Sequence, residues 1–212
     1  MRAFLREILI IIIVAIGIFF LLQTTLQSFV VVGASMEPAF EQGQRLLVNK
    51  AVYRFREPQR GEVIVFHPPS NQRDDYIKRI IALPGDTVKI KKGVVYVNDS
   101  KLSEPYINVE DPPKYSLRQQ TIPDNNYFVL GDNRNNSNDS HKGWTVEDEA
   151  IIGKAWLSIW PPNQWGLVAH YPLQEQLSST KLLPQLPQVE MNHGRSTMGA
   201  SMGNGYLLQL SH

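Results

Sequence analysis

One long apolar run near the N-terminus dominates the pattern of hydrophobic and polar positions in this 212-residue chain. Every residue from Ile8 to Leu22 is apolar or glycine, and after a mildly polar stretch the apolar character resumes through Val32. A helix needs about 20 apolar residues to span the hydrocarbon core of a bilayer. We therefore expect a short N-terminal segment, 1–7, followed by a transmembrane helix over residues 8–30.

The flanking charges predict an orientation for this helix. Arg2 and Arg6 precede the apolar run, and the next basic residue after it is Arg45. Because positive charges favour the cytoplasmic side, we expect a single-pass protein with a cytoplasmic N-terminus. The same pattern, ending in Val32-x-Ala34, also describes a cleavable secretory signal peptide. In both interpretations the rest of the chain is exported.

Beyond residue 40 the apolar positions follow the short periods of β-strands. Strands are expected over residues 44–49, 61–66, 75–81, 87–90, 94–97 and 127–130, with a last strand pair over 150–160. Lys91-Lys92-Gly93 is typical of a hairpin turn between two of them. No long segment here has a helical period, so we expect an all-β fold with one N-terminal transmembrane helix.

Two segments lack a regular period. Residues 100–124 are polar and dotted with proline, which predicts a long surface excursion between strands. Residues 163–212 are rich in Gln, Ser, Leu and Gly, which predicts a poorly ordered tail. The folded domain is therefore expected over residues 31–162.

Composition excludes several classes of function. The net charge is +1 and the charges are mixed, so we expect no nucleic-acid partner. The chain has no cysteine, which excludes a disulfide framework, a thiol nucleophile and a cysteine-ligated metal. The five histidines are scattered without a His-x-x-x-His pair, so no zinc site is predicted, and nothing suggests another cofactor.

Three features together could support catalysis by a serine. Ser35 directly follows the apolar run, but a serine is a weak nucleophile at neutral pH and needs a base. Neither His67 nor His141 carries the signature of a catalytic triad. Lys78 lies in an apolar strand, where desolvation can lower the pKa of a lysine; a half-buried lysine whose ammonium reaches water is the alternative. The third feature is the polar loop 131–140, which can brace itself through side-chain-to-backbone bonds and an ion pair.

Four segments occur in an order and spacing that cover about residues 8–162: SMEP at 35–38, RGEVIVF at 60–66, YIKRIIALPGD at 76–86 and GDNRNNSNDS at 131–140. By these segments the chain resembles the bacterial type I signal peptidases. The resemblance implies a serine endopeptidase anchored in the plasma membrane, with a largely β, extracytoplasmic catalytic domain. It also implies removal of signal peptides from exported preproteins, after small residues at −3 and −1, and it favours the anchor over the cleaved signal peptide.

The resemblance assigns roles to individual residues. Ser35 is expected to attack the scissile carbonyl, and Lys78 is expected to act as its general base. Ser137 matches the hydroxyl that orients the lysine amine. The positions that brace the loop correspond to Asp132, Arg134 and Asp139.

Two positions depart from part of the family. Gly33 stands where some members have a serine as second oxyanion donor, so that side-chain donor is missing here. His141 stands where many members have arginine, which weakens the expected ion pair with Asp139 unless the histidine is protonated.

An extended substrate is expected to pair with an open strand edge beside a shallow apolar pocket. The candidates for the pocket wall, whose alternative role is membrane contact or core packing, are Phe29, Val31, Val32, Met36 and Ile77. The expected partners are signal peptides of preproteins and the lipid bilayer, with protein export machinery as a further candidate.

Two other functions remain as alternatives. A self-cleaving regulator of the repressor type would use the same serine–lysine chemistry, but the membrane run and the missing helix-turn-helix region argue against it. An exported β-domain for binding or assembly would leave Ser35 and Lys78 incidental. The intact loop 131–140 argues against this second alternative, because a binding module does not need these residues together.

Overall fold

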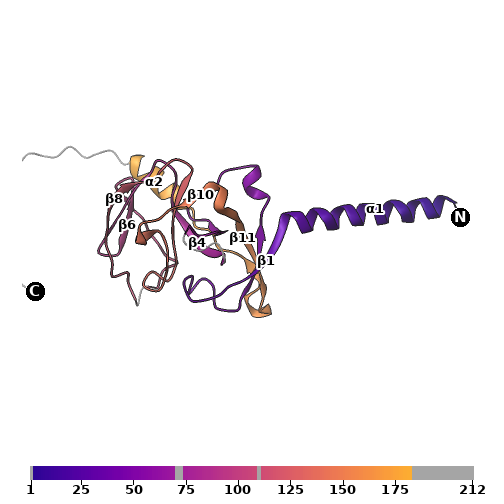
Figure 1. Ribbon diagram of the computed structural model, residues 1–212, viewed down its shortest axis with the longest axis horizontal. Coiled ribbons are helices and arrows are strands. Elements are labelled where there is room, and N and C mark those ends of the chain that lie inside the picture. Colours follow the sequence, from indigo (N-terminus) through magenta and orange to yellow (C-terminus); the bar gives the residue numbers. More distant parts are fainter. Residues whose placement is uncertain (1, 70–73, 109–110, 183–212) are drawn as a thin grey trace, which may run out of the picture.

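The computed structural model describes residues 2–69, 74–108 and 111–182. An apolar helix, α1 (Arg2–Thr25), extends away from a folded domain that is built of two β-sheets (Figure 1). Among the described residues, α1 is the one helix long and apolar enough to cross a membrane, with a mean hydropathy of 2.8 over its most apolar stretch. That stretch is not covered by the domain, so α1 fits a membrane anchor.

The helix ends at Thr25 rather than at residue 30. The hydroxyls of Thr24 and Thr25 donate hydrogen bonds back to the Leu21 carbonyl, where the apolar run gives way to polar residues. The next residues form strand β1 (Leu26–Val30), which pairs antiparallel with β2 (Arg45–Asn49). The apolar residues after the polar break therefore belong to the folded domain and not to the membrane helix.

The larger sheet is antiparallel and has the order β1-β2-β11-β3-β4-β9-β10, with β12 beside β11. Its further strands are β3 (Val63–Phe66), β4 (Tyr76–Ala82), β9 (Asn126–Leu130), β10 (Val146–Glu147), β11 (Ile151–Trp160) and β12 (Gly166–Leu167). The predicted strands over 44–49, 61–66, 75–81 and 127–130 are confirmed. Residues 150–160 were expected as a strand pair but form one long strand that pairs with β2 on one edge and β3 on the other, with register shifts in both ladders.

The smaller sheet has the order β7-β6-β5-β8. The predicted hairpin is confirmed as β5 (Thr87–Lys91) and β6 (Val94–Val97), with Gly93 in its turn at a φ of 79°. The expected surface excursion supplies the other two strands, β7 (Ser100–Lys101) and β8 (Leu117–Thr121). A hydrophobic core joins the sheets, with Ile81 and Phe128 from the larger and Val88 and Val95 from the smaller.

Short 3-10 helices connect several strands: η1 (Val52–Arg54), η2 (Ser140–Lys142), η3 (Asp148–Ala150) and η4 (Pro162–Gln164). With one apolar helix followed by two β-sheets, the predicted fold class is confirmed.

The C-terminal region differs from the expected poorly ordered tail. After β12, residues 173–182 form helix α2 (Leu173–Leu182), and Leu173 and Leu177 are buried in the core between the sheets. Two apolar residues four positions apart lie on one face of a helix, a signal too short to stand out in a polar stretch. Residues 183–212, also expected to be poorly ordered, lie outside the described residues.

Candidate active site

The segment that follows β1 presents Ser35 on a tight turn. The Glu37 N–H donates to the Ala34 carbonyl at 3.2 Å, and the Phe40 N–H donates to the Met36 carbonyl at 2.9 Å. Met36 and Phe40 are buried in a hydrophobic cluster with Val31, Leu46, Val63, Ala155 and Val168, and Ile77 packs against it. Because apolar side chains on both sides of Ser35 are fixed in this cluster, its hydroxyl is held at the surface of the domain.

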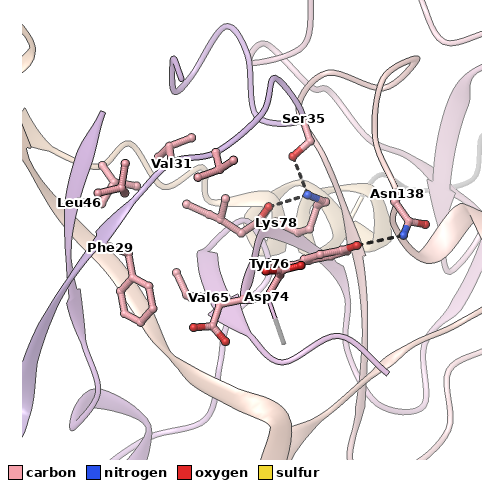
Figure 2. Close-up of a pocket in the computed structure, with 13 residues that line it drawn as sticks. Phe29, Val31, Ser35, Leu46, Val65, Asp74, Tyr76, Lys78 and Asn138 are labelled. Carbon is pink, nitrogen blue, oxygen red and sulfur yellow. Dashed lines mark hydrogen bonds between the residues drawn. The ribbon is translucent and has the colours of Figure 1, made fainter. Parts of the chain in front are cut away.

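Lys78 reaches the same place from the inner strand β4. Its Nζ donates hydrogen bonds to Ser35 Oγ at 2.6 Å and to the Ile77 carbonyl at 2.8 Å (Figure 2). The residue is only 4% exposed. Burial lowers the pKa of the Lys78 ammonium from its ordinary 10.5 to about 8, although the negative charges of Asp139 and Asp132 oppose the shift. A substantial fraction of this amine is therefore neutral near pH 8.

Loop 131–140 is bonded to the backbone of the Ser35 turn. The Asn133 N–H donates to the Ser35 carbonyl at 3.1 Å, and the Asn133 side-chain amide donates to the Ala34 carbonyl at 3.0 Å. A side chain at Gly131 would overlap with the Ser35 carbonyl and the Ser137 hydroxyl. The loop and the turn are thus in direct contact, with no space left between them.

Three largely buried side-chain pairs brace this loop, and two of them are bidentate ion pairs. Asp132 accepts two hydrogen bonds from Arg79, at 2.9 and 2.6 Å, and Arg134 donates two to Glu104, at 2.9 and 2.6 Å. Bidentate pairs of this kind fix orientation as well as distance. Arg79 and Glu104 were not predicted as site residues. Strand alternation does place Arg79 on the sheet face opposite Lys78, but the sequence does not reveal which carboxylate lies there.

The third pair joins Asp139 and His141. His141 Nδ1 lies 2.6 Å from Asp139 Oδ1, and the other oxygen of Asp139 accepts from the Gly131 N–H at 2.9 Å. Although burial opposes it, the hydrogen bonds from His141 and Gly131 hold the pKa of Asp139 below its usual range. The His141 ring also stacks on Tyr115, with centroids 4.2 Å apart. Although His141 stands where arginine was expected, its side chain still makes a close contact with Asp139.

Ser137 is not joined to Lys78 in the same way. Its hydroxyl is buried and has no hydrogen-bond partner of good geometry within the described part of the chain, although it lies near enough to Asp139 to help lower the pKa of that carboxyl. The structure therefore brings Ser35 and Lys78 into a hydrogen bond and leaves Ser137 in the adjacent loop without one.

A cleft of about 580 Å³ ends at Ser35 and Lys78. Of the five residues expected in its wall, Phe29, Val31, Val32 and Ile77 line it, whereas Met36 is buried in the cluster below. The structure adds Leu46 and Val65, which sequence reasoning missed (Figure 2). They are the cross-strand partners of Phe29 and Ile77, so only the strand register could have identified them.

The remaining residues of the cleft are Val30, Asp74, Asp75, Tyr76 and Asn138. The Tyr76 ring lies 5.3 Å from the Lys78 amine, and its hydroxyl accepts from the Asn138 side chain at 3.3 Å. No group of three His, Asp or Glu side chains that could hold a metal ion is found in the described ranges.

An apolar cleft that ends at a serine beside a buried lysine is typical of a serine hydrolase. Residues 2–160 match the family model described as signal peptidase, peptidase S26. The chain is 44% identical over 144 residues to a probable signal peptidase I-1 of Synechocystis, covering 65% of this chain and 72% of the relative. It is 35% identical over 174 residues to signal peptidase IB of Staphylococcus aureus, covering 72% and 90%. A crystal structure of a signal peptidase I from Enterococcus faecalis aligns with a TM-score of 0.41 and 34% identity, over 47% of this chain and 97% of that one.

The chain therefore belongs to the signal peptidase family, peptidase S26, and it is a serine endopeptidase.

Proposed function

We propose that this chain removes N-terminal signal peptides from exported preproteins, with Ser35 as nucleophile and Lys78 as general base. The observation that carries the proposal is the 2.6 Å contact between Lys78 Nζ and Ser35 Oγ at the end of an apolar cleft. The relatives that are named signal peptidases support the class of substrate.

The reaction follows from the chemistry of these two groups. The neutral Lys78 amine takes the proton of Ser35 Oγ, which attacks the scissile carbonyl carbon and forms a tetrahedral intermediate. When this collapses, the Lys78 ammonium gives the proton to the leaving amine, and an ester between Ser35 and the signal peptide remains. A water that gives a proton to Lys78 then hydrolyses the ester and restores both residues.

The oxyanion of the intermediate needs donors placed in advance. The backbone N–H of Ser35 is the first. Gly33 has no side chain to donate, so position 33 does not supply a side-chain donor as the second. For the supporting loop, we propose that Ser137 orients the Lys78 amine once substrate is bound, and that Asp132, Arg134 and Asp139 brace the loop.

Recognition of the substrate rests on strand β1. Within the described part of the chain it is an edge strand that pairs with β2 alone, and Phe29 and Val30 from it line the cleft together with Ile77 of β4. An extended peptide that adds to such an edge presents alternate side chains to the same wall. Side chains at −3 and −1 would thus both meet the cleft, whose wall includes the half-buried Ile77 and the buried Val31.

We further propose that α1 anchors the enzyme in the plasma membrane, with the N-terminus in the cytoplasm and the domain outside. The Lys50 N–H donates to the Thr25 carbonyl at 2.8 Å, and β1 follows the helix without a linker, so the cleft lies close to the membrane surface. Because the chain has no cysteine, a single cysteine at the exposed Lys92 should react with an impermeant reagent in intact cells. Reaction only after lysis would contradict this orientation. The bilayer is then one partner, and the export machinery that delivers preproteins is a second.

The proposal is tested on the full chain in detergent with a preprotein that carries an Ala-x-Ala site. Mass spectrometry should find a cut after the −1 residue with the wild type and with Lys91→Ala, an exposed lysine of the smaller sheet that serves as control. Ser35→Ala and Lys78→Ala should not cut. Cutting by folded Ser35→Ala would overturn the assignment of the nucleophile, and no cutting by the wild type would favour an exported binding module.

A further inference from the structure

Residues 168–177, called the C-terminal strap below, follow the part of the chain that matches the family model. We propose that this strap positions the catalytic centre: Ala169 and Tyr171 hold the guanidinium of Arg79, and Arg79 in turn holds loop 131–140 against the Ser35 turn. This inference rests on the proposed function, because it assigns to Tyr171 an effect on that same reaction.

The strap is fixed to the domain at its start. The Val168 N–H donates to the Trp156 carbonyl of β11 at 2.9 Å. The Val168 side chain is 6% exposed and packs in the cluster that also contains Val31 and Met36, on either side of Ser35. The first residue of the strap therefore contributes to the same small core that supports the nucleophile turn.

The strap is also fixed at its end, where α2 lies at the side of the domain away from α1 (Figure 1). Leu173 and Leu177 are buried in the core between the two sheets. The Gln176 side chain exchanges two hydrogen bonds with the Ser103 backbone, at 2.8 and 3.1 Å, and Gln174 accepts from Arg60 at 3.0 Å. With both ends held, the residues between them have a defined place.

Between these ends the strap contacts Arg79, which is 1% exposed. The Ala169 carbonyl accepts a hydrogen bond from Arg79 Nη1 at 3.2 Å. The guanidinium carbon lies 5.0 Å from the centre of the Tyr171 ring and 4.3 Å from that of Tyr106. The two ring centres are 4.9 Å apart, so the rings form one continuous aromatic wall beside the cation. A buried guanidinium is favoured by such a wall and loses that contact if the ring is removed.

The strap also packs closely against Gly61, which lies in the segment 60–66 that carries part of the family resemblance. Arg79 Nη1 also donates to the Gly61 carbonyl at 2.9 Å, and a side chain at Gly61 would overlap with the Tyr171 carbonyl. Gly61 has a φ of 88°, a conformation that residues with a side chain rarely adopt. The backbone at position 61 therefore lies against that of Tyr171, whose N–H donates to the Gly61 carbonyl at 3.5 Å.

Arg79 transmits this position to the reacting atoms. Its Nε and Nη2 donate to the two oxygens of Asp132, and the next residue, Asn133, is bonded to the backbone of Ser35 and Ala34. Arg79 is also the chain neighbour of Lys78 on β4. Loss of the Tyr171 ring would let the guanidinium shift, and with it the loop that sets the distance between Ser35 and Lys78. Displacements of about 1 Å at a catalytic contact cost up to about a hundredfold in rate.

The test compares three variants of the full chain: Tyr171→Ala, which removes the ring, Tyr171→Phe, which keeps it, and Val146→Ala, which removes a buried side chain of strand β10, outside the strap. For each, kcat and KM are measured with the Ala-x-Ala preprotein below the unfolding transition. We expect Tyr171→Ala to lower kcat about tenfold or more while KM changes less than about twofold. Tyr171→Phe should keep the wild-type kcat. Val146→Ala should lower the melting temperature and keep kcat.

The outcomes separate the inference from the function on which it rests. If the wild type cleaves and folded Tyr171→Ala has the same kcat, the positioning role of the strap is wrong and the proposed function stands. If Val146→Ala loses as much kcat as Tyr171→Ala, the effect is one of general destabilisation and the role of the Tyr171 ring is refuted. If the wild type does not cleave, the proposed function itself fails.

Discussion

Lys78 Nζ lies 2.6 Å from Ser35 Oγ, although the two residues are 43 positions apart in the chain. Lys78 lies on β4, and Ser35 lies in the turn after β1, which is the edge strand of the same sheet. Three strands, β2, β11 and β3, separate β1 from β4 in the order of that sheet. A flat sheet would keep the ends of β1 and β4 well apart, because neighbouring strands are about 4.8 Å from each other. The sheet must curl so that its edge strand faces an inner strand, and the cleft is the space enclosed by that curl.

The burial of Lys78 predicts how activity depends on pH. Because burial disfavours the ammonium, the folded pKa of about 8 lies below the ordinary 10.5, and the neutral base is formed as pH rises through that value. We expect kcat/KM to rise from about pH 6 to a plateau above about pH 9, with a midpoint near 8. The measurement is kcat/KM for the Ala-x-Ala preprotein across this range.

The pH profile has a direct control in Lys91→Ala, which should show the wild-type profile because Lys91 is exposed on the smaller sheet. A midpoint close to the ordinary lysine value of 10.5, or a profile without a rising limb, would contradict the assignment of Lys78 as a buried general base.

The pair between His141 and Asp139 predicts an effect on stability. Removing the ring with His141→Ala leaves a fully buried carboxylate without its side-chain partner, which we expect to lower the free energy of unfolding by about 1–3 kcal/mol. His141→Arg should keep most of the stability, because a guanidinium can pair with the same oxygen. The free energy of unfolding is measured by denaturant titration in detergent at neutral pH.

The direction of the pH effect follows from the Asp139 carboxyl, whose pKa in the folded state lies below its ordinary 3.8. Its contribution to stability is complete above that ordinary value and is lost as pH falls through the folded value. The His141→Ala variant loses one of the bonds that hold the pKa down, so its acid unfolding should begin at a higher pH than that of the wild type. Identical acid transitions in the two proteins would refute the coupling.

The close packing at Gly131 predicts how strongly activity depends on the contact between loop 131–140 and the Ser35 turn. A Cβ at this position would overlap with the Ser35 carbonyl and the Ser137 side chain, so Gly131→Ala must push the turn and the loop apart. Overpacking of this kind costs about 1–3 kcal/mol of stability, and here it also moves the peptide that carries the nucleophile. We expect kcat to fall at least about tenfold. Gly166→Ala, which has open space around the added methyl group, should keep both stability and activity; equal effects of the two changes would contradict the steric argument.

Sequence reasoning recovers the elements of this fold better than their arrangement. The length of the apolar run identifies α1, and short runs rich in β-branched residues identify β2, β3, β4 and the β5–β6 hairpin, because these signals are local. Strand order is not local. Leu46 and Val65 enter the cleft only through their cross-strand partners, and no pattern in the sequence reveals those pairs.

The same limit applies to the active site. Ser35 and Lys78 stand out by their surroundings and by the family segments that contain them, but the partner of Asp132 does not, since an arginine next to a candidate base gives no sign of the carboxylate on its far side. The end of α1 was placed five residues too late, and α2 was not predicted, for a related reason. Residues 26–30 pair with β2, and Leu173 and Leu177 pack in the core between the sheets. The sequence shows neither contact, because the first segment continues an apolar run and the second lies in a polar stretch.

The cleft wall predicts how the enzyme discriminates between substrates. Ile77 is half-buried, lines the cleft and lies next to the proposed base, so Ile77→Ala should enlarge the space that receives a side chain at −1 or −3. Each methylene accommodated in an apolar pocket is worth about 1–3 kcal/mol, or roughly 10- to 200-fold in kcat/KM. We therefore expect the preference for alanine over leucine at these positions to fall at least about tenfold, measured as the ratio of kcat/KM for two preproteins that differ at one site. Val95→Ala removes a buried apolar side chain from the smaller sheet and should leave that ratio unchanged while lowering stability. If Ile77→Ala keeps the wild-type ratio at both positions, the side chain that selects small residues must be another member of the wall.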